Sequence, residues 1–135
     1  MKLLEAKFKK VRKGKLPKTN LKKNTLKFGV IGIKAMESGL LNTYQMDSML
    51  ILLKKKLKKT AKIWIRIYPH VSITSKPLEV RMGKGKGSIK YLSAKISCGS
   101  ILIELTHKKI SKSTIISILK SIKYKFPVKT KLTYI

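Results

Sequence analysis

Side chains able to do covalent, acid–base or metal chemistry are few in this sequence and far apart. Cys98 is the only cysteine, so it cannot form an internal disulfide, and its alternating apolar surroundings are typical of a small core residue. His70 and His107 show no ligand spacing. We therefore predict no catalytic site, no metal site and no cofactor. The acids are equally scattered, at Glu5, Glu37, Asp47, Glu79 and Glu104.

The most unusual stretch is 80–87, where glycine alternates with lysine in the string VRMGKGKG. In an extended conformation Lys84 and Lys86 would lie on one side, and the glycines would leave backbone N–H groups open to phosphate. Neither G-x-x-x-x-G-K-[ST] nor G-x-G-x-x-G is present, which disfavours a nucleotide-binding loop. The alternative to a phosphate-contacting loop is a mobile hairpin tip without function.

Basic residues dominate the ionic composition. The 135 residues contain 33 Lys and Arg against 5 Asp and Glu, a formal charge of +28. A compact chain of this length has a radius of gyration of about 14 Å, and the Debye length is about 8 Å at physiological salt, so these charges repel one another strongly. We therefore expect a polyanionic partner, which means nucleic acid, an anionic membrane or an acidic protein.

A membrane is the weakest of these candidates. The longest uninterrupted apolar run is 49–53, far short of the roughly 18 residues that a spanning helix needs. The N-terminal residues also show no secretory or lipidation signal. We expect no membrane partner.

The first 27 residues hold eleven Lys and Arg and one acid, without a convincing hydrophobic period. We interpret 1–27 as an extended basic arm along phosphates and 28–135 as a single folded domain. The alternatives are a solvated tail or, less well supported because lysine replaces arginine and serine, a mitochondrial transit peptide. The candidate phosphate-contacting residues of the arm are Lys7, Lys9, Lys10, Arg12, Lys13 and Lys15.

Periodicity in the first half of the domain predicts a strand and then a helix. The strand covers 28–34, where two glycines allow close backbone approach, and Gly39 is predicted as a turn. Asn42 and Gln45 form a capping-box-like start for a helix over 43–59. Lysines at its end suit the helix dipole and are also candidate phosphate-contacting residues, namely Lys55, Lys58 and Lys59. The predicted core stripe is Met46, Met49, Leu50, Leu53 and Leu57.

The segment 62–68 alternates cleanly and predicts a strand with a buried isoleucine face. Its other face carries Trp64, Arg66 and Tyr68, which could stack on bases or form a half-covered sheet surface. Because no RNP-type motif is present, we favour the structural interpretation.

The second half predicts an antiparallel hairpin over 89–98 and 100–105. A helix follows from Ser111 or Ser113 to about Lys125, and a final strand over 129–134 closes the sheet. We predict one α+β domain with an antiparallel sheet, two helices packed on it, a projecting Gly/Lys-rich loop and a basic N-terminal arm. The inward stripe of the second helix is Ile115, Ile118, Leu119 and Ile122.

Three strings resemble the bacterial-type large-subunit ribosomal protein L-sixteen family: FGVIGIKA at 28–35, KIWIRIYP at 62–69, and KPLEVRMGKGKG at 76–87. The resemblance extends into the arm and into FPVKT at 126–130. The R-M-G-x-G-K-G pattern in its K-P…E-V context is highly specific.

The resemblance implies a non-catalytic protein that binds large-subunit rRNA near the peptidyl transferase centre and helps organise the aminoacyl-tRNA site. It also implies neighbouring ribosomal proteins as partners and no homo-oligomer. The matching loop would face the functional centre and the bound tRNA. Its residues are Arg81, Met82, Gly83, Lys84, Gly85, Lys86 and Gly87.

Several positions depart from that family. Leu50 and Ile51 replace an arginine pair, which predicts an apolar outer helix face covered by a protein or by compacted rRNA. Cys98 replaces a proline before the hairpin glycine, and the second helix begins with lysines rather than acids. Those lysines oppose the helix dipole and predict local anionic compensation.

The 30 lysines against 3 arginines, with abundant isoleucine, are typical of A+T-rich coding sequence. With no transit peptide recognised, we expect a mitochondrion-encoded protein of the mitochondrial matrix; a plastid or the cytoplasm of an A+T-rich bacterium is the alternative. The main alternative function is a non-ribosomal architectural protein that coats nucleic acid, which the charge alone would permit. An RNA-modifying enzyme lacks any plausible acid, base or cofactor motif.

Overall fold

The computed structural model describes residues 10–19, 23–58, 60–107 and 111–134. They form two helices and two antiparallel sheets, which confirms the α+β class. The elements are β1 (Ile31–Ala35), β2 (Gly39–Asn42), α1 (Thr43–Leu57), β3 (Ala61–Ile65), β4 (Val71–Ser75), β5 (Ser88–Ile96), β6 (Ile101–His107), α2 (Lys112–Lys123) and β7 (Thr130–Tyr134).

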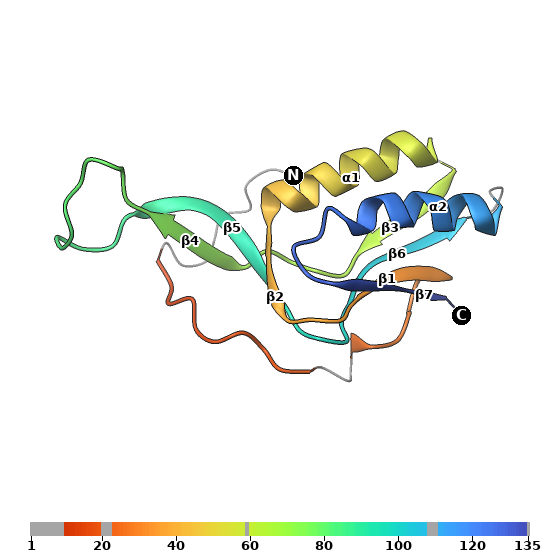
Figure 1. Ribbon diagram of the computed structural model, residues 1–135, viewed down its shortest axis with the longest axis horizontal. Coiled ribbons are helices and arrows are strands. Elements are labelled where there is room, and N and C mark those ends of the chain that lie inside the picture. The colour runs from red at the N-terminus through yellow and green to blue at the C-terminus, as the bar shows by residue number, and fades with distance from the viewer. Residues whose placement is uncertain (1–9, 20–22, 59, 108–110, 135) are drawn as a thin grey trace.

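The two sheets have different structural roles. The four-stranded sheet has the order β3-β6-β1-β7, and both helices cover one of its faces (Figure 1). The three-stranded sheet has the order β2-β5-β4, and its β4–β5 ribbon reaches away from the helices and carries the loop 76–87 at its tip (Figure 1). The four-stranded sheet therefore builds the core, while the three-stranded sheet positions the loop.

The predicted hairpin over 89–98 and 100–105 is wrong. β5 pairs with β2 and β4, whereas β6 pairs with β1 and β3. The turn between them passes the chain from one sheet to the other, and Gly99 there has a φ of +85°. β6 is buried on both faces from Ile101 to Leu105, so it takes the centre of its own sheet and needs two neighbours.

Two short strands were not predicted. Gly39, predicted as a turn, begins β2, and a Cβ there would lie 2.4 Å from Cγ1 of Val128. This glycine allows close packing and does not reverse the chain. β4 was not assigned to any element. β2 and β4 have only four and five residues, too few for a hydrophobic period to stand out.

Both helices begin as predicted. The Asn42 side chain accepts from the backbone N–H of Tyr44 at 3.3 Å, and the Gln45 side chain accepts from the Asn42 N–H at 3.0 Å, which completes the capping box. Ser111 caps α2 by accepting from the N–H of Thr114 at 3.4 Å. The buried stripes are Met46, Met49, Leu53 and Leu57 on α1, and Ile115, Ile118, Leu119 and Ile122 on α2.

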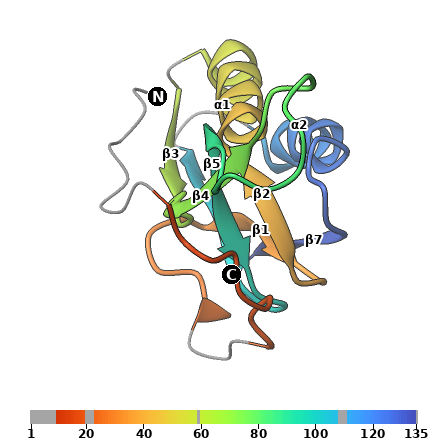
Figure 2. The ribbon, with the colours of Figure 1, turned by 90° about the vertical axis from the view of Figure 1, so that its left-hand side faces the viewer.

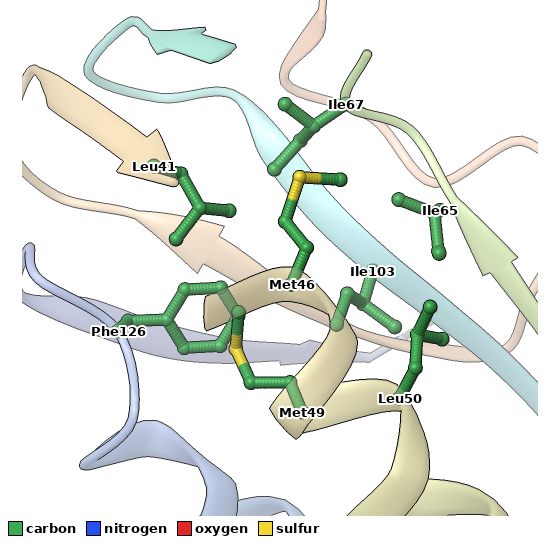
Figure 3. A pocket seen from close by; sticks show the side chains of 8 residues that line it. All are labelled: Leu41, Met46, Met49, Leu50, Ile65, Ile67, Ile103 and Phe126. Atoms are coloured by element: carbon green, nitrogen blue, oxygen red, sulfur yellow. The ribbon is translucent and has the colours of Figure 1, made fainter. Parts of the chain in front are cut away.

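Leu50 does not lie on an apolar outer face of α1, so that part of the prediction is wrong. It is half-buried and points toward Ile65 and Ile103 (Figure 3). These side chains surround a wholly apolar cavity of about 10 Å³, a packing gap that offers neither the volume nor the polar partners a ligand needs. Ile51 does face outward, with 67% of its surface exposed.

Candidate nucleic-acid interface

Residues 10–19 of the basic arm run beside the three-stranded sheet, opposite the helices (Figure 1). Lys95 Nζ donates to the carbonyl of Lys15 at 3.1 Å, and Ser38 Oγ donates to the carbonyl of Pro17 at 2.7 Å. Because the domain holds the arm by its backbone carbonyls, the arm's own cationic side chains stay exposed. Arg12 and Lys13 are both exposed, Lys13 at a surface hollow that it lines together with Asn42 and Tyr91, so phosphate could approach them.

The arm and the Gly/Lys-rich loop meet, although they lie some seventy residues apart in the sequence. Lys10 Nζ donates to the carbonyl of Lys86 at 2.7 Å, and Lys86 Nζ donates to the carbonyl of Val11 at 2.7 Å. We call this reciprocal pair of hydrogen bonds the arm–loop clasp. It joins two groups of candidate residues that the sequence predicted separately.

The loop is curled, so the extended conformation considered for 80–87 is wrong. Gly83, Lys84 and Gly85 have φ values of +93°, +51° and +87°. Glycine adopts such values without steric cost, so Gly83 and Gly85 are unstrained. Lys84 is the one residue of the three with a side chain, and it too lies in the left-handed region. Lys84 is exposed, whereas the ammonium of Lys86 lies in the clasp. The two lysines therefore do not form one cationic edge.

The tip of the loop presents both charge and apolar surface. Arg81 is exposed, and Leu78 and Met82 are almost completely exposed, at 104% and 97%. The base of the loop is tight, since a Cβ on Gly87 would lie 2.4 Å from the carbonyl oxygen of Ser75. Figure 2 views the molecule from the end that carries this loop.

The root of the arm is fixed by a buried carboxylate. Glu104 is completely buried, and its Oε2 accepts backbone N–H groups from Lys27, Phe28 and Gly29 at 3.1, 2.7 and 2.9 Å. Its Oε1 forms an ion pair with Nη1 of Arg66. Burial raises the pKa of Glu104, but Arg66 and the three N–H donors outweigh it, so the net pKa lies below the usual value.

Sequence reasoning missed this anchor, because Glu104 looked like one of five scattered acids. The sequence did contain a signal for it. Glu104 lies in the apolar run ILIEL, which predicts burial, and a buried charge requires a partner. The partner could not be chosen from sequence alone, because the pairing that brings β3 beside β6 spans about forty residues.

The mixed face of the 62–68 segment has a structural role, as favoured from the sequence. Trp64 stacks on Phe28 with ring centroids 6.2 Å apart, and the Arg66 guanidinium lies 5.8 Å from the centre of the Phe28 ring. These groups pack on Phe28 at the arm's root, and the Phe28 ring remains 59% exposed. Tyr68 is 56% exposed.

The structure does not bring the helix lysines to the clasp. Lys55 and Lys58 are exposed at the C-terminal end of α1, which lies at the opposite end of the molecule from the loop (Figure 1). The predicted residues Lys7, Lys9 and Lys59 lie outside the described residues. The candidate interface therefore consists of a clasped arm–loop region and a separate cationic helix end.

The grouping of titratable side chains in the described part of the chain bears on the predicted lack of a metal site. No group of three His, Cys, Asp or Glu side chains able to hold a metal ion occurs within it. The buried ion pair there serves the arm's root. None of the helices in these residues combines the length and apolarity needed to span a bilayer.

Comparison with known proteins identifies the class. The family model described as "Ribosomal protein L16p/L10e" matches residues 4–133, and the chain belongs to this family. It is a ribosomal protein, a structural component and not an enzyme, and the resemblance predicted from its motifs is confirmed.

Individual relatives cover most of the chain. "Large ribosomal subunit protein uL16" of Sulfurihydrogenibium sp. (strain YO3AOP1) is 36% identical over 128 residues, which are 95% of this chain and 91% of that protein. "Large ribosomal subunit protein uL16c" of Emiliania huxleyi is 36% identical over 126 residues, 93% and 90% of the two chains. The uL16 protein of Ureaplasma parvum serovar 3 is 40% identical over 105 residues, 78% and 75%.

Proposed function

We propose that this structural constituent of the large ribosomal subunit binds large-subunit rRNA near the peptidyl transferase centre and helps organise the aminoacyl-tRNA site. The observation that carries the proposal is the arm–loop clasp, because it joins the basic arm and the projecting loop into one cationic surface. Side chains from both segments remain exposed on that surface, among them Arg12, Lys13, Arg81 and Lys84. Such cations contact phosphates and so set position rather than sequence preference.

The arm, proposed as 1–27, follows rRNA, and the domain, proposed as 28–135, supports it. The Glu104 anchor at 27–29 lies at this boundary and fixes the direction in which the arm leaves the domain. The lysines at the end of α1 make a further rRNA contact.

The loop faces the functional centre and the aminoacyl-site tRNA. Glycines 83 and 85 have open space around the position of a Cβ, so their positive φ, and not crowding, calls for glycine there. The curled tip then places Arg81, Met82 and Lys84 at the far end of the ribbon, where they can reach a neighbouring ligand.

The proposed partners are large-subunit rRNA, aminoacyl-site tRNA and neighbouring ribosomal proteins, with no membrane partner and no homo-oligomer. The proposed location is the mitochondrial matrix, as part of the mitochondrial ribosome; a plastid or the cytoplasm of an A+T-rich bacterium is the alternative. The excess of lysine over arginine supports an A+T-rich genome in each case.

Reconstitution of large subunits tests the proposal. We expect the protein to sediment with the subunit and to cross-link selectively to rRNA. The double variant Arg81→Ala/Lys84→Ala should enter subunits as well as the native chain but slow elongation, since exposed tip residues carry little fold stability. Lys62→Ala/Lys131→Ala is a matched control, because both lysines are exposed on the sheet away from the loop.

Normal elongation by the loop variant would overturn the role of the loop. Failure to sediment with the subunit, together with uniform coating of duplex DNA, would instead favour the architectural nucleic-acid-binding alternative.

A further inference from the structure

The outer side of the helix pair is cationic and rich in hydroxyl groups. We use "helix-pair surface" for the exposed residues of 43–58 and 111–125, all of which lie within the described chain. These 17 exposed residues comprise eight lysines, six serines or threonines, two tyrosines and one isoleucine, and none is acidic. Asp47, the acid in these ranges, is half-buried.

The hydroxyl and ammonium groups follow the outer ridge of each helix. Ser113, Ser117 and Lys120 lie opposite the buried stripe of α2, at spacings of four and three residues. Ser48 and Lys55 occupy the corresponding ridge of α1, seven residues apart. On α2, Ser113 and Ser117 lie between Lys112 and Lys120, whereas on α1 Ser48 precedes the exposed lysines, which begin at Lys54.

The two ridges belong to one continuous surface. Lys56 Nζ on α1 donates to Ser121 Oγ on α2 at 2.8 Å, which spans the seam between the helices. In Figure 1 the helices lie side by side over the four-stranded sheet, on the other side of the molecule from the arm. The arm–loop region and the helix-pair surface therefore face different directions.

We propose that the helix-pair surface docks on double-helical RNA across its minor groove. The minor groove of A-form RNA is wide and shallow and displays 2′-hydroxyl groups between two phosphate backbones. Serine hydroxyls can donate to and accept from 2′-hydroxyls at close approach, while the lysines reach the flanking phosphates. The presence of short hydroxyl and long cationic side chains on one surface matches this pattern.

Charge and composition favour RNA over an acidic protein as the partner. The centres of protein–protein interfaces are depleted in lysine and enriched in aromatic and apolar residues. On the helix-pair surface Ile51, Tyr44 and Tyr124 are the exposed apolar or aromatic residues, against eight lysines, and such a composition does not fit an interface centre. Eight like charges on one face also repel one another, and an RNA backbone compensates them over its whole length.

This inference rests on the proposed rRNA binding and goes further, because it places RNA on two sides of the domain. The arm and the loop contact one RNA segment, and the helix-pair surface contacts a second, base-paired one. The protein then bridges two parts of the folded rRNA.

A tethered cleavage probe tests the inference in reconstituted large subunits. An iron chelate that generates hydroxyl radicals is attached to Ser117→Cys in a Cys98→Ser background, and in a second sample to Lys13→Cys on the arm. We expect Ser117→Cys to give cuts on both strands of a base-paired rRNA segment, offset across its minor groove. The Lys13→Cys probe should cut a different segment.

Charge reversal provides the matched comparison. Adding Lys55→Glu/Lys120→Glu to the Ser117→Cys protein should lower its duplex cleavage by at least about fivefold, because two phosphate contacts become repulsive. Adding Lys62→Glu/Lys131→Glu makes the same change of charge on the opposite face of the sheet and should leave that cleavage within about twofold.

The outcomes separate the two proposals. Cuts from Lys13→Cys together with none from Ser117→Cys would overturn the helix-pair inference and leave the proposed function intact. Cuts confined to single-stranded rRNA, or cross-linking of Ser117→Cys to a protein, would overturn the inference in favour of another partner. If neither probe cut rRNA, both the proposed function and this inference would be overturned.

Discussion

The two ends of the described arm are held in opposite ways. At its root, residues 27–29 donate three backbone hydrogen bonds to the completely buried carboxylate of Glu104. At its tip, the arm–loop clasp consists of exposed lysine-to-carbonyl hydrogen bonds. A buried charge without its partners costs several kcal/mol, whereas an exposed hydrogen bond exchanges readily with water. The root therefore belongs to the folded core, and the tip is free to exchange its contacts for phosphate.

The largest loss of stability is expected from a substitution at the root of the arm. Glu104→Ala leaves the mostly buried Arg66 guanidinium without its carboxylate and three backbone N–H groups without an acceptor. We expect a loss of about 3–5 kcal/mol in the free energy of unfolding, measured by urea denaturation. Glu37→Ala, which removes the exposed ion pair with Lys129, is the control and should leave the urea midpoint nearly unchanged, because solvent screens an exposed pair. Equal losses in the two variants would mean that Glu104 does not anchor the root.

The next largest loss of stability is expected where an added Cβ would clash with the backbone. A Cβ on Gly29 would lie 2.8 Å from both the backbone N and the carbonyl O of Leu105, whereas a Cβ on Gly83 would meet nothing within 4 Å. Gly29→Ala should therefore lower the free energy of unfolding by about 1–3 kcal/mol. Gly83→Ala should strain the loop at its positive φ and leave the urea transition nearly unchanged. If Gly83→Ala proved the more destabilising, the loop would be part of the cooperative core.

The stability that Glu104 contributes at the root should also depend on pH. The folded-state pKa of Glu104 is lowered, so its stabilisation is complete above the unfolded-state pKa and is lost as the pH falls through the folded-state pKa. Stability measured from pH 7 down to pH 3 should therefore fall less in Glu104→Gln than in the native chain. Parallel pH profiles for the two proteins would show that other carboxylates control acid unfolding.

The smallest stability effect is expected at the tip. Lys86→Ala removes one of the two clasp hydrogen bonds, both exposed, so the free energy of unfolding should change by less than about 0.5 kcal/mol. Trypsin cleavage after Arg12 and Lys13 should nevertheless become several-fold faster, because the arm is released locally. Lys90→Ala, an exposed lysine of β5 outside the clasp, should leave the cleavage rate unchanged. An unchanged rate in Lys86→Ala would mean that the clasp does not restrain the arm.

Local signals in the sequence predicted the helices and their caps correctly. The capping box at Asn42, the Ser111 cap and the two buried stripes depend on residues within one or two turns of each other. The alternation over 129–134 likewise predicted the final strand, and the structure adds that this strand, β7, pairs with β1.

Pairing between distant segments was harder to predict. The short link between β5 and β6 is typical of a hairpin, and only the double burial of β6 places that strand at the centre of another sheet. The same limit applies to the interface. The basic arm and the glycine-rich loop could each be recognised, but the clasp and the Glu104 anchor depend on contacts across about seventy-five positions.

The chain passes from β5 directly into β6, and this connection separates the position of the loop from the types of residue on the surface. The ribbon that carries the loop continues through one short turn into the central strand of the core sheet, and the turn is secured by hydrogen bonds between Gly99, Ser100 and the backbone of Ala35. The reach of the loop is thus set by main-chain geometry, which does not depend on which cation occupies a surface position. Exchange of lysine and arginine at exposed positions should therefore leave the position of the loop unchanged.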